Sequence, residues 1–256
     1  MQKLDILQGD LSVNNILIRR IPAAHLPPGV GNFRSSITCH LNDQTYISFG
    51  FLIDFDYAFS VNNESSKLEL HKRSGTVPYM ALECLNNSIS SNTFTHSYRH
   101  DLESLLYTAL VIMVYTVGPS TLLKPVGDGP LIAEWFTKTT PDGVYKSKIG
   151  LLSALDLLYK PDLPSYWDDA YIHIKELVLC CWPQSHLGEP NCAEYEDFLH
   201  ILRDGAKKVQ EPSGILSPRY PAQYIVLNKR RLGNENEYLR ESKRRRPRLG
   251  RIVDIL

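Results

Sequence analysis

The longest uncharged apolar stretch of the sequence, Ser104–Val117, has to be buried, and this requirement limits the folds open to the chain. It is about one third shorter than the roughly 20 residues that a membrane-spanning helix needs. Asp101 is a suitable N-cap before the stretch, and Gly118-Pro119 is a suitable stop after it. The sequence therefore predicts a helix from Asp101 that is apolar nearly all round and forms the centre of a protein core.

Strand signals lie before residue 100 and helix signals after it. The strand signals are two short apolar runs around a polar turn, Leu4–Leu7 and Ile16–Ile18, and the β-branched and aromatic run Tyr46–Ile53. Two further helices are predicted at Asp168–Cys181 and Cys192–Val209. Arg19–Gln44 is rich in Pro, Gly, Ser and Asn and predicts a long surface loop. The expected fold class is α+β, mainly helical, with a small β element.

The charge of the chain is unevenly distributed. The whole chain has 28 Lys and Arg against 28 Asp and Glu, but residues 229–251 alone hold ten Lys or Arg and three Glu, a net charge of +7. We expect residues 1–210 to form the folded domain and residues 211–256 a basic, disordered tail. Such basic clusters are usually unstructured, solvated surface, but they also fit an import-receptor signal for the nucleus: Lys229, Arg230, Arg231, Lys243, Arg244, Arg245 and Arg246. Tyr238 is the one aromatic residue nearby, which argues against nucleic-acid binding by base stacking.

The spacing of the cysteines and histidines along the sequence does not predict a metal site. The five cysteines form no Cys-x-x-Cys pair, and the eight histidines show no His-Glu-x-x-His motif. We interpret the cysteines as small apolar side chains in a reducing compartment. No apolar signal-peptide core is visible in Met1–Asp10. The expected location is intracellular, in the cytoplasm or nucleus, with no membrane partner.

An acid and an amide stand five residues apart in the polar turn Gly9–Asn15. The carboxylate of Asp10 can orient a substrate hydroxyl and accept its proton, while the amide oxygen of Asn15 can bind Mg²⁺. A second carboxylate, Asp54, follows a buried strand in Phe51–Asp56 and is a suitable cation ligand on a rigid element. Taken singly, each motif is more often an ordinary capped turn than a functional site.

A third motif, Arg73–Glu83, reads Arg-Ser-Gly-Thr-Val-Pro-Tyr-Met-Ala-Leu-Glu, and Asp101-Leu-Glu-Ser follows it. The order and spacing of these motifs are much more specific than any one of them, because they match the catalytic loop, the metal-binding Asp and the end of the activation segment of protein kinases. Over roughly residues 4–208 the chain resembles the C-terminal lobe of a protein kinase, most closely the fungal-type protein kinase family.

The resemblance implies a Ser/Thr-type protein phosphotransferase that uses ATP and Mg²⁺ and acts on a protein substrate. Asp10 would be the catalytic base, and Asn15 and Asp54 the Mg²⁺ ligands. The implied substrate loop includes Gly75, Thr76 and Tyr79, with Thr76 hydrogen-bonded to Asp10. The implied structural residues are Glu83, which would anchor that loop, and Asp101, which would bind the catalytic-loop backbone.

The sequence departs from the family pattern at several points. Gln8-Gly9 replaces the His-Arg before the catalytic Asp, so a phosphorylated activation segment would lack its Arg partner. Ser12 and Asp56 replace Lys and Gly, as the family tolerates, and the insert 19–44 is unexplained. No Gly-rich loop or strand Lys precedes Asp10, so the N-terminal lobe is expected to be missing. We therefore expect this chain alone to be inactive, because those parts position the phosphates.

Two alternative functions remain open from the sequence. Gly9-Asp10 with Asn15 also resembles the loop of small-molecule kinases that phosphorylate aminoglycosides or choline, although those enzymes lack a segment like Gly75–Glu83. The other alternative is a pseudokinase that serves as a non-catalytic binding module.

Overall fold

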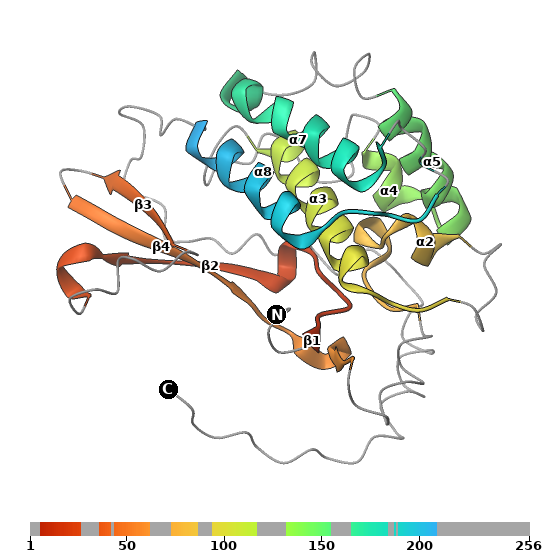
Figure 1. The fold of residues 1–256 in the computed structure, drawn as a ribbon, viewed down its shortest axis with the longest axis horizontal. Helices are drawn as coiled ribbons and strands as arrows, with labels where there is room; N and C mark the ends of the chain where they lie inside the picture. The colour runs from red at the N-terminus through yellow and green to blue at the C-terminus, as the bar shows by residue number, and fades with distance from the viewer. Residues whose placement is uncertain are drawn as a thin grey trace. The chain divides into compact units, whose positions relative to one another are not determined.

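The computed structural model of the chain describes residues 6–26, 36–41, 44–61, 73–86, 94–116, 132–154, 165–183, 187 and 189–208 (Figure 1). The chain divides into two compact units, Met1–Ala222 and Gln223–Leu256. All described residues belong to the first unit, so the basic clusters of the tail and its predicted disorder lie outside the described residues.

The central element of the first unit is α3 (Tyr98–Tyr115), which is buried over most of its circumference. Its core residues include Leu106, Leu110 and Val114, none of which is exposed to solvent. The predicted buried helix is therefore present, but it begins earlier than predicted, because Ser97 and not Asp101 is the N-cap. Ser97 accepts from a backbone N–H of the first turn, and the side chain of His100 accepts from the Ser97 N–H. These two bonds form a capping box in which His replaces the usual Glu.

The other helices pack around α3 in two groups (Figure 1). One group is α7 (Asp168–Cys181) and α8 (Tyr195–Lys208), which contact each other and α3. The second is α2 (Leu82–Leu85), α4 (Ala133–Thr137) and α5 (Pro141–Ser153). The bounds of α7 are those predicted, and α8 begins slightly later than predicted.

The sequence did not indicate α4 and α5. In α5, Thr140 is the N-cap and its side chain accepts a hydrogen bond from the backbone N–H of Gly143 at 3.2 Å. Pro141 occupies the first turn, where its missing N–H costs nothing. The sequence Pro-Asp-Gly at positions 141–143 is also typical of turns, so it does not identify the start of α5.

Two small antiparallel sheets lie near the N-terminus of the described chain. The first pairs β1 (Ile6–Leu7) with β5 (Phe59–Ser60). The second has the order β2-β4-β3, and its strands are β2 (Ile16–Pro22), β3 (Ser36–Leu41) and β4 (Gln44–Leu52). Short 3-10 helices complete the described elements: Val13–Asn15, Ala23–His25, Phe55–Tyr57, Val77–Tyr79 and Ser165–Trp167.

The interpretation of Arg19–Gln44 as a surface loop is wrong for much of that segment. Arg19–Pro22 continues β2 as far as the pairing of Pro22 with Tyr46, and residues 36–41 form β3 along the other edge of β4. Each strand pairs with β4 on one side, which satisfies the backbone groups that face β4, whereas the prolines and glycines that suggested a loop are concentrated between β2 and β3. Residues 27–35 and 42–43 lie outside the described residues.

The fold is thus α+β and mainly helical, as the sequence predicts. Among the described residues, no helix combines the length and the apolar character needed to cross a membrane.

Candidate functional site

Gly9 sits in the turn between β1 and the 3-10 helix Val13–Asn15 and adopts a positive φ of 72°. A Cβ at this position would lie 2.8 Å from the backbone carbonyl oxygen of Tyr57. Both observations require glycine, because a side chain would be strained and would also collide with fixed backbone. Gly9 stands where the family pattern has Arg, and this turn has no room for an Arg side chain.

Asp101 binds the backbone of the same turn from the first turns of α3. Its Oδ2 accepts a hydrogen bond from the Gln8 N–H at 2.8 Å, and its Oδ1 accepts one from the Gly9 N–H at 3.1 Å. Hydrogen bonds from two amides to one carboxylate are charge-assisted and are stronger than neutral ones. The turn is therefore attached to the central helix just before Asp10.

Gln8 links this turn to the segment that carries Asp54. Its side chain is fully buried, and its Oε1 accepts from the Asp10 N–H at 2.8 Å. Its Nε2 donates to the backbone carbonyl oxygens of Asp54 at 3.2 Å and Ile53 at 3.5 Å. A single amide thus uses both its acceptor and its donor to hold the two candidate acidic segments together. Sequence reasoning gave Gln8 no role beyond a departure from the family pattern.

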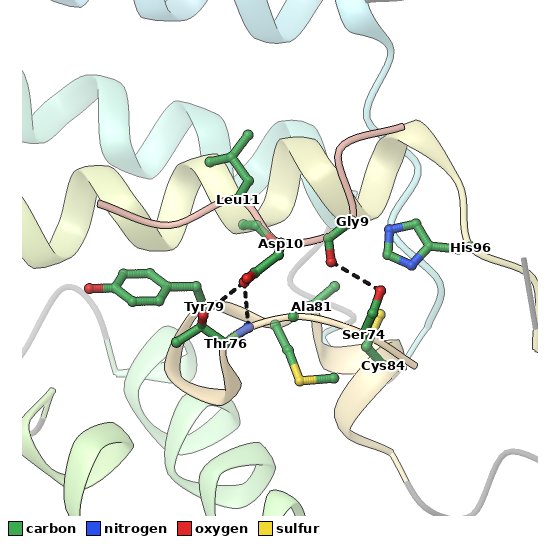
Figure 2. Close-up of a pocket in the computed structure, with 12 residues that line it drawn as sticks. Gly9, Asp10, Leu11, Ser74, Thr76, Tyr79, Ala81, Cys84 and His96 are labelled. Atoms are coloured by element: carbon green, nitrogen blue, oxygen red, sulfur yellow. Dashed lines mark hydrogen bonds between the residues drawn. The ribbon is translucent and has the colours of Figure 1, made fainter. Parts of the chain in front are cut away.

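The carboxylate of Asp10 faces the segment that begins at Ser74 (Figure 2). Its Oδ1 accepts from the backbone N–H of Thr76 at 2.6 Å and from the Thr76 hydroxyl at 2.8 Å. Burial raises the pKa of Asp10, the hydrogen bonds from Thr76 oppose this rise, and the negative charge of Asp54 adds to it. A carboxylate that is positioned and whose pKa lies above its ordinary value is suited to accept a proton.

Asn15 and Asp54 are brought together by the ladder between β2 and β4. Asn15 immediately precedes β2, Asp54 follows β4, and the Ile53 N–H donates to the Asn15 carbonyl oxygen at 2.9 Å. The amide nitrogen of Asn15 donates to the carbonyl oxygen of Asp10 at 2.6 Å, which leaves the amide oxygen as the atom that could bind a cation. Asp54 has a positive φ of 58°, and its side chain is exposed. Amide and carboxylate oxygens are the donors that Mg²⁺ prefers, so this pair fits such an ion.

The sequence-predicted substrate loop lies against the Asp10 turn. Gly75 has a φ of 125°, and a Cβ there would lie 3.3 Å from the carbonyl oxygen of Gly9. Tyr79 is buried, with 2% of its surface exposed, and its ring packs edge-on against Phe136 of α4. Tyr79 therefore anchors the loop in the core and does not present its side chain to solvent.

Two buried ionisable side chains hold the backbone that follows this loop. Lys148 of α5 donates from Nζ to the Met80 carbonyl oxygen at 2.6 Å, and its Nζ lies 3.5 Å from the centre of the Tyr107 ring. Glu103 of α3 accepts from the Leu82 N–H at 2.6 Å and from the Tyr107 hydroxyl at 2.6 Å. Burial raises the pKa of Glu103 to about 7 and lowers the pKa of Lys148 well below its ordinary value. Sequence reasoning missed both residues.

Glu83 pairs with a histidine of the central helix. Its Oε2 lies 2.9 Å from Nε2 of His100 on α3. The hydrogen bond from His100 lowers the pKa of Glu83, whereas burial outweighs this contact and lowers the pKa of His100. We therefore describe the contact as a neutral imidazole N–H donating to a carboxylate. Glu83 thus ties α2 to the start of α3.

A small cavity lies between the Asp10 turn and the segment 74–84 (Figure 2). Asp10 lines it from the turn, Ser74 and Thr76 line it from the facing segment, and Cys84 and His96 also contribute to its wall. Its volume is about 10 Å³, which is room for about one water molecule. The cavity is too small for a nucleotide and is instead a gap behind the candidate catalytic carboxylate.

The comparisons with known proteins bear on the part of the chain that holds this site. Residues 1–113 match the family model described as fungal protein kinase. No curated protein and no solved structure matches the chain. The match spans every motif from Asp10 to Asp101, and the predicted resemblance to fungal-type protein kinases is thereby confirmed over these residues.

Proposed function

We propose that the chain carries the catalytic half of a protein kinase centre, which would transfer a phosphoryl group from ATP to a Ser or Thr hydroxyl of a protein substrate. The observation that carries this proposal is the set of hydrogen bonds that three residues make to Asp10, two from its own turn and one from a distant segment. Thr76 binds its carboxylate, the side chain of Gln8 binds its backbone N–H, and Asn15 binds its backbone carbonyl. This arrangement would hold one carboxylate near Asn15 and Asp54, the proposed cation ligands, as phosphoryl transfer requires.

Asp10 is the proposed base. The substrate oxygen would form a bond to the γ-phosphorus of ATP while the bond to the β–γ bridging oxygen breaks, and the hydroxyl proton would go to Asp10. Because the Thr76 contacts fix Oδ1, the carboxylate is held in one orientation before substrate arrives. Such preorganisation is the main contribution that a protein makes to this chemistry.

Asn15 and Asp54 are the proposed ligands of Mg²⁺. When bound, the ion would neutralise the charge that develops on the transferred phosphate. The β2–β4 ladder keeps the two ligands in register. The positive φ of Asp54 is an uncommon conformation for a residue other than glycine, and such conformations are concentrated at functional sites.

The segment Gly75–Glu83 is the proposed substrate loop and favours a protein kinase over a small-molecule kinase. Both its ends are fixed, by Asp10 at Thr76 and by His100 at Glu83. Buried side chains also bind its backbone at Met80 and Leu82. We infer a rigid surface against which an extended polypeptide could be positioned.

We propose that this chain alone binds Mg-ATP weakly and transfers little phosphate, because phosphoryl transfer also needs groups that clamp the triphosphate. The cation ligands can be tested independently of ATP with Mn²⁺ as a paramagnetic substitute for Mg²⁺. We expect Mn²⁺ to broaden the amide NMR signals of Asn15 and Asp54 first. Asp54→Asn should abolish that selectivity, whereas Asp56→Asn, an exposed carboxylate two positions away, should preserve it. Equal broadening in both variants would contradict the proposed ligand pair.

A further inference from the structure

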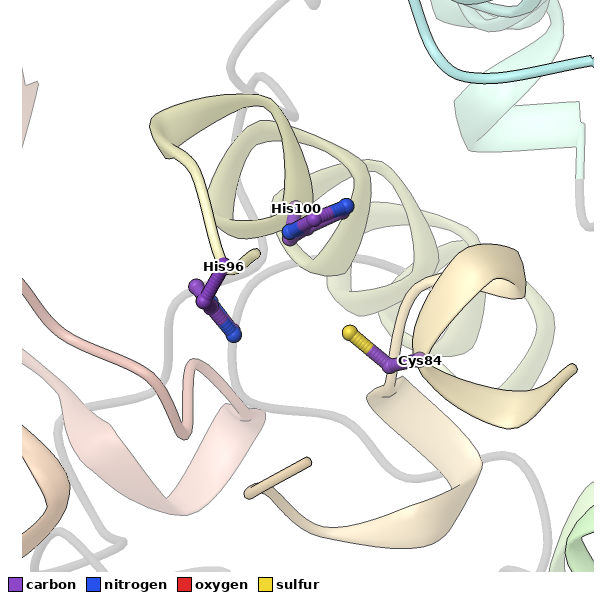
Figure 3. Close-up of side chains that lie close together, drawn as sticks. All are labelled: Cys84, His96 and His100. Carbon is purple, nitrogen blue, oxygen red and sulfur yellow. The ribbon is translucent and has the colours of Figure 1, made fainter. Parts of the chain in front are cut away.

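Three buried side chains with metal-binding chemistry meet where α2 approaches the start of α3 (Figure 3). Cys84 belongs to α2, His100 to the first turn of α3, and His96 to the segment just before that helix. One ligand atom from each lies within 4.8 Å of the others. The exposed fractions of Cys84, His96 and His100 are 3%, 5% and 3%.

His96 is the residue of this cluster that the protein alone leaves unsatisfied. Within the described part of the chain, neither of its ring nitrogens has a hydrogen-bond partner. Its Nε2 lies 3.6 Å from Oδ1 of Asp101, which is beyond hydrogen-bond distance. Phe59 and Phe94 pack edge-on against the ring. Burial of a polar group without a partner is unfavourable, so a ligand for this imidazole is the simplest explanation of its position.

His100 can bind a metal ion if it gives up one of its two hydrogen bonds. Its Nδ1 accepts a hydrogen bond from the Ser97 N–H at 3.0 Å, and its Nε2 lies 2.9 Å from Glu83. If a metal ion replaces the Ser97 contact at Nδ1, the contact with Glu83 is kept. Glu83 would then orient a metal-bound histidine, as outer carboxylates do in other metal sites.

Cys84 supplies the third donor. Without a metal its thiol is protonated, because burial raises the pKa of Cys84 above its ordinary value. A bound ion would displace that proton to solvent and convert the sulfur to a thiolate. Figure 3 shows the sulfur directed into the space between the two imidazoles.

We propose that Cys84, His96 and His100 bind one Zn²⁺ ion. Sulfur and imidazole donors select Zn²⁺ and related ions and disfavour Mg²⁺, so this site differs chemically from the oxygen ligands Asn15 and Asp54. The small cavity that borders Cys84 and His96 has room for a water molecule as the fourth ligand. The ion would connect α2 to α3 and so fix the end of the segment Gly75–Glu83. This inference does not depend on phosphoryl transfer.

The test uses the full chain after metal removal by a chelator, with Co²⁺ as a spectroscopic probe. We expect one equivalent of Co²⁺ to give tetrahedral absorption and a thiolate-to-cobalt charge-transfer band, and Zn²⁺ to displace it. Cys84→Ser should abolish the charge-transfer band, and His96→Phe, which keeps an aromatic ring between Phe59 and Phe94, should abolish tetrahedral binding. Cys192→Ser is the matched control, since Cys192 is an exposed free cysteine, and it should leave both signals unchanged.

Two further measurements keep the proposal open to refutation if a ligand variant does not fold. Glu83→Gln retains all three ligands and should weaken Co²⁺ binding about 10–100-fold. Zn²⁺ should raise the unfolding temperature of the unmodified chain, because it binds the folded state. The proposal is wrong if the unmodified chain shows no charge-transfer band and no Zn²⁺ stabilisation. It is also wrong if Cys192→Ser removes the band while Cys84→Ser keeps it.

Discussion

Oδ1 of Asp10 accepts two hydrogen bonds from Thr76, from the backbone N–H at 2.6 Å and from the side-chain hydroxyl at 2.8 Å. One residue of the segment 73–86 thus holds the candidate base by two independent groups. The backbone contact survives any substitution at Thr76 except proline, whereas the hydroxyl contact can be removed alone. The two contributions can therefore be separated by mutation.

Thr76→Val should lower the free energy of unfolding by about 1 kcal/mol, because it removes one hydrogen bond to a partly solvated carboxylate. Thr76→Ser keeps a hydroxyl and is the matched control. Urea unfolding of the two variants measures the difference. Equal stability of the Val and Ser variants would show that the hydroxyl contact contributes nothing.

Gln8→Leu should lower the free energy of unfolding by about 2–4 kcal/mol, because it leaves the Asp10 N–H and the Asp54 carbonyl without their buried partner. Gln8→Glu keeps an acceptor for the Asp10 N–H but loses the donor to Asp54. Amide hydrogen exchange at Asp10 should accelerate in the Leu variant and stay closer to the original rate in the Glu variant. If the two variants exchange equally at Asp10, Gln8 does not hold this amide.

Glu103→Gln should change the pH dependence of stability. Burial raises the pKa of Glu103 to about 7 in the folded protein, so the folded state holds this proton more tightly than the unfolded chain. This contribution is complete below the ordinary pKa of 4.5 and is lost as pH rises to about 7, a difference of about 3 kcal/mol. The variant should lack that decline between pH 4.5 and 7 in urea unfolding.

Other ionisable groups face Glu103 and shape the curve of the unmodified chain. Lys148 acts with the opposite sign, because its lowered pKa makes the folded state gain stability as pH rises toward the ordinary lysine value. Tyr107, Cys84 and Cys181 have raised pKa values and stay protonated over this interval. The difference between variant and unmodified chain isolates Glu103, and parallel curves would refute its titration.

Lys148→Met should destabilise the fold, because the Met80 carbonyl loses its donor and Glu103 loses a nearby cation. The double variant with Glu103→Gln should lose less stability than the two single variants predict together. A double-mutant cycle measured by urea unfolding should give an interaction of about 0.5–3 kcal/mol. Strict additivity would show that the two buried groups act independently.

The sequence predicts the fold best where one local pattern determines one element. The apolar run after residue 104 and the one-sided pattern of Asp168–Cys181 each give a helix that the structure contains. The start of α3 could not be predicted, because the cap depends on a contact between Ser97 and a histidine in place of the usual Glu. The strand β3 was concealed by its proline-rich surroundings and is determined by pairing with β4.

The candidate site shows the same division. Asp10, Asn15 and Asp54 are identified by order and spacing along the chain. Gln8, Glu103 and Lys148 are not, because their roles depend on backbone groups that are brought to them from other segments. Nor does spacing single out Cys84 and His96, which become neighbours only when α2 packs beside the start of α3.

The ladder between β2 and β4 lets one end of the sheet hold Asn15 and Asp54 while the other end can change in length. Its near end joins Ile16 to Leu52 beside Asn15 and Asp54, and its far end joins Pro22 to Tyr46. A shift of one residue in pairing would turn every side chain of a strand to the opposite face and would displace Asn15 relative to Asp54. Insertions beyond the far end leave the near pairing intact, so this is a place where the protein could gain new sequence during evolution without moving Asn15 relative to Asp54.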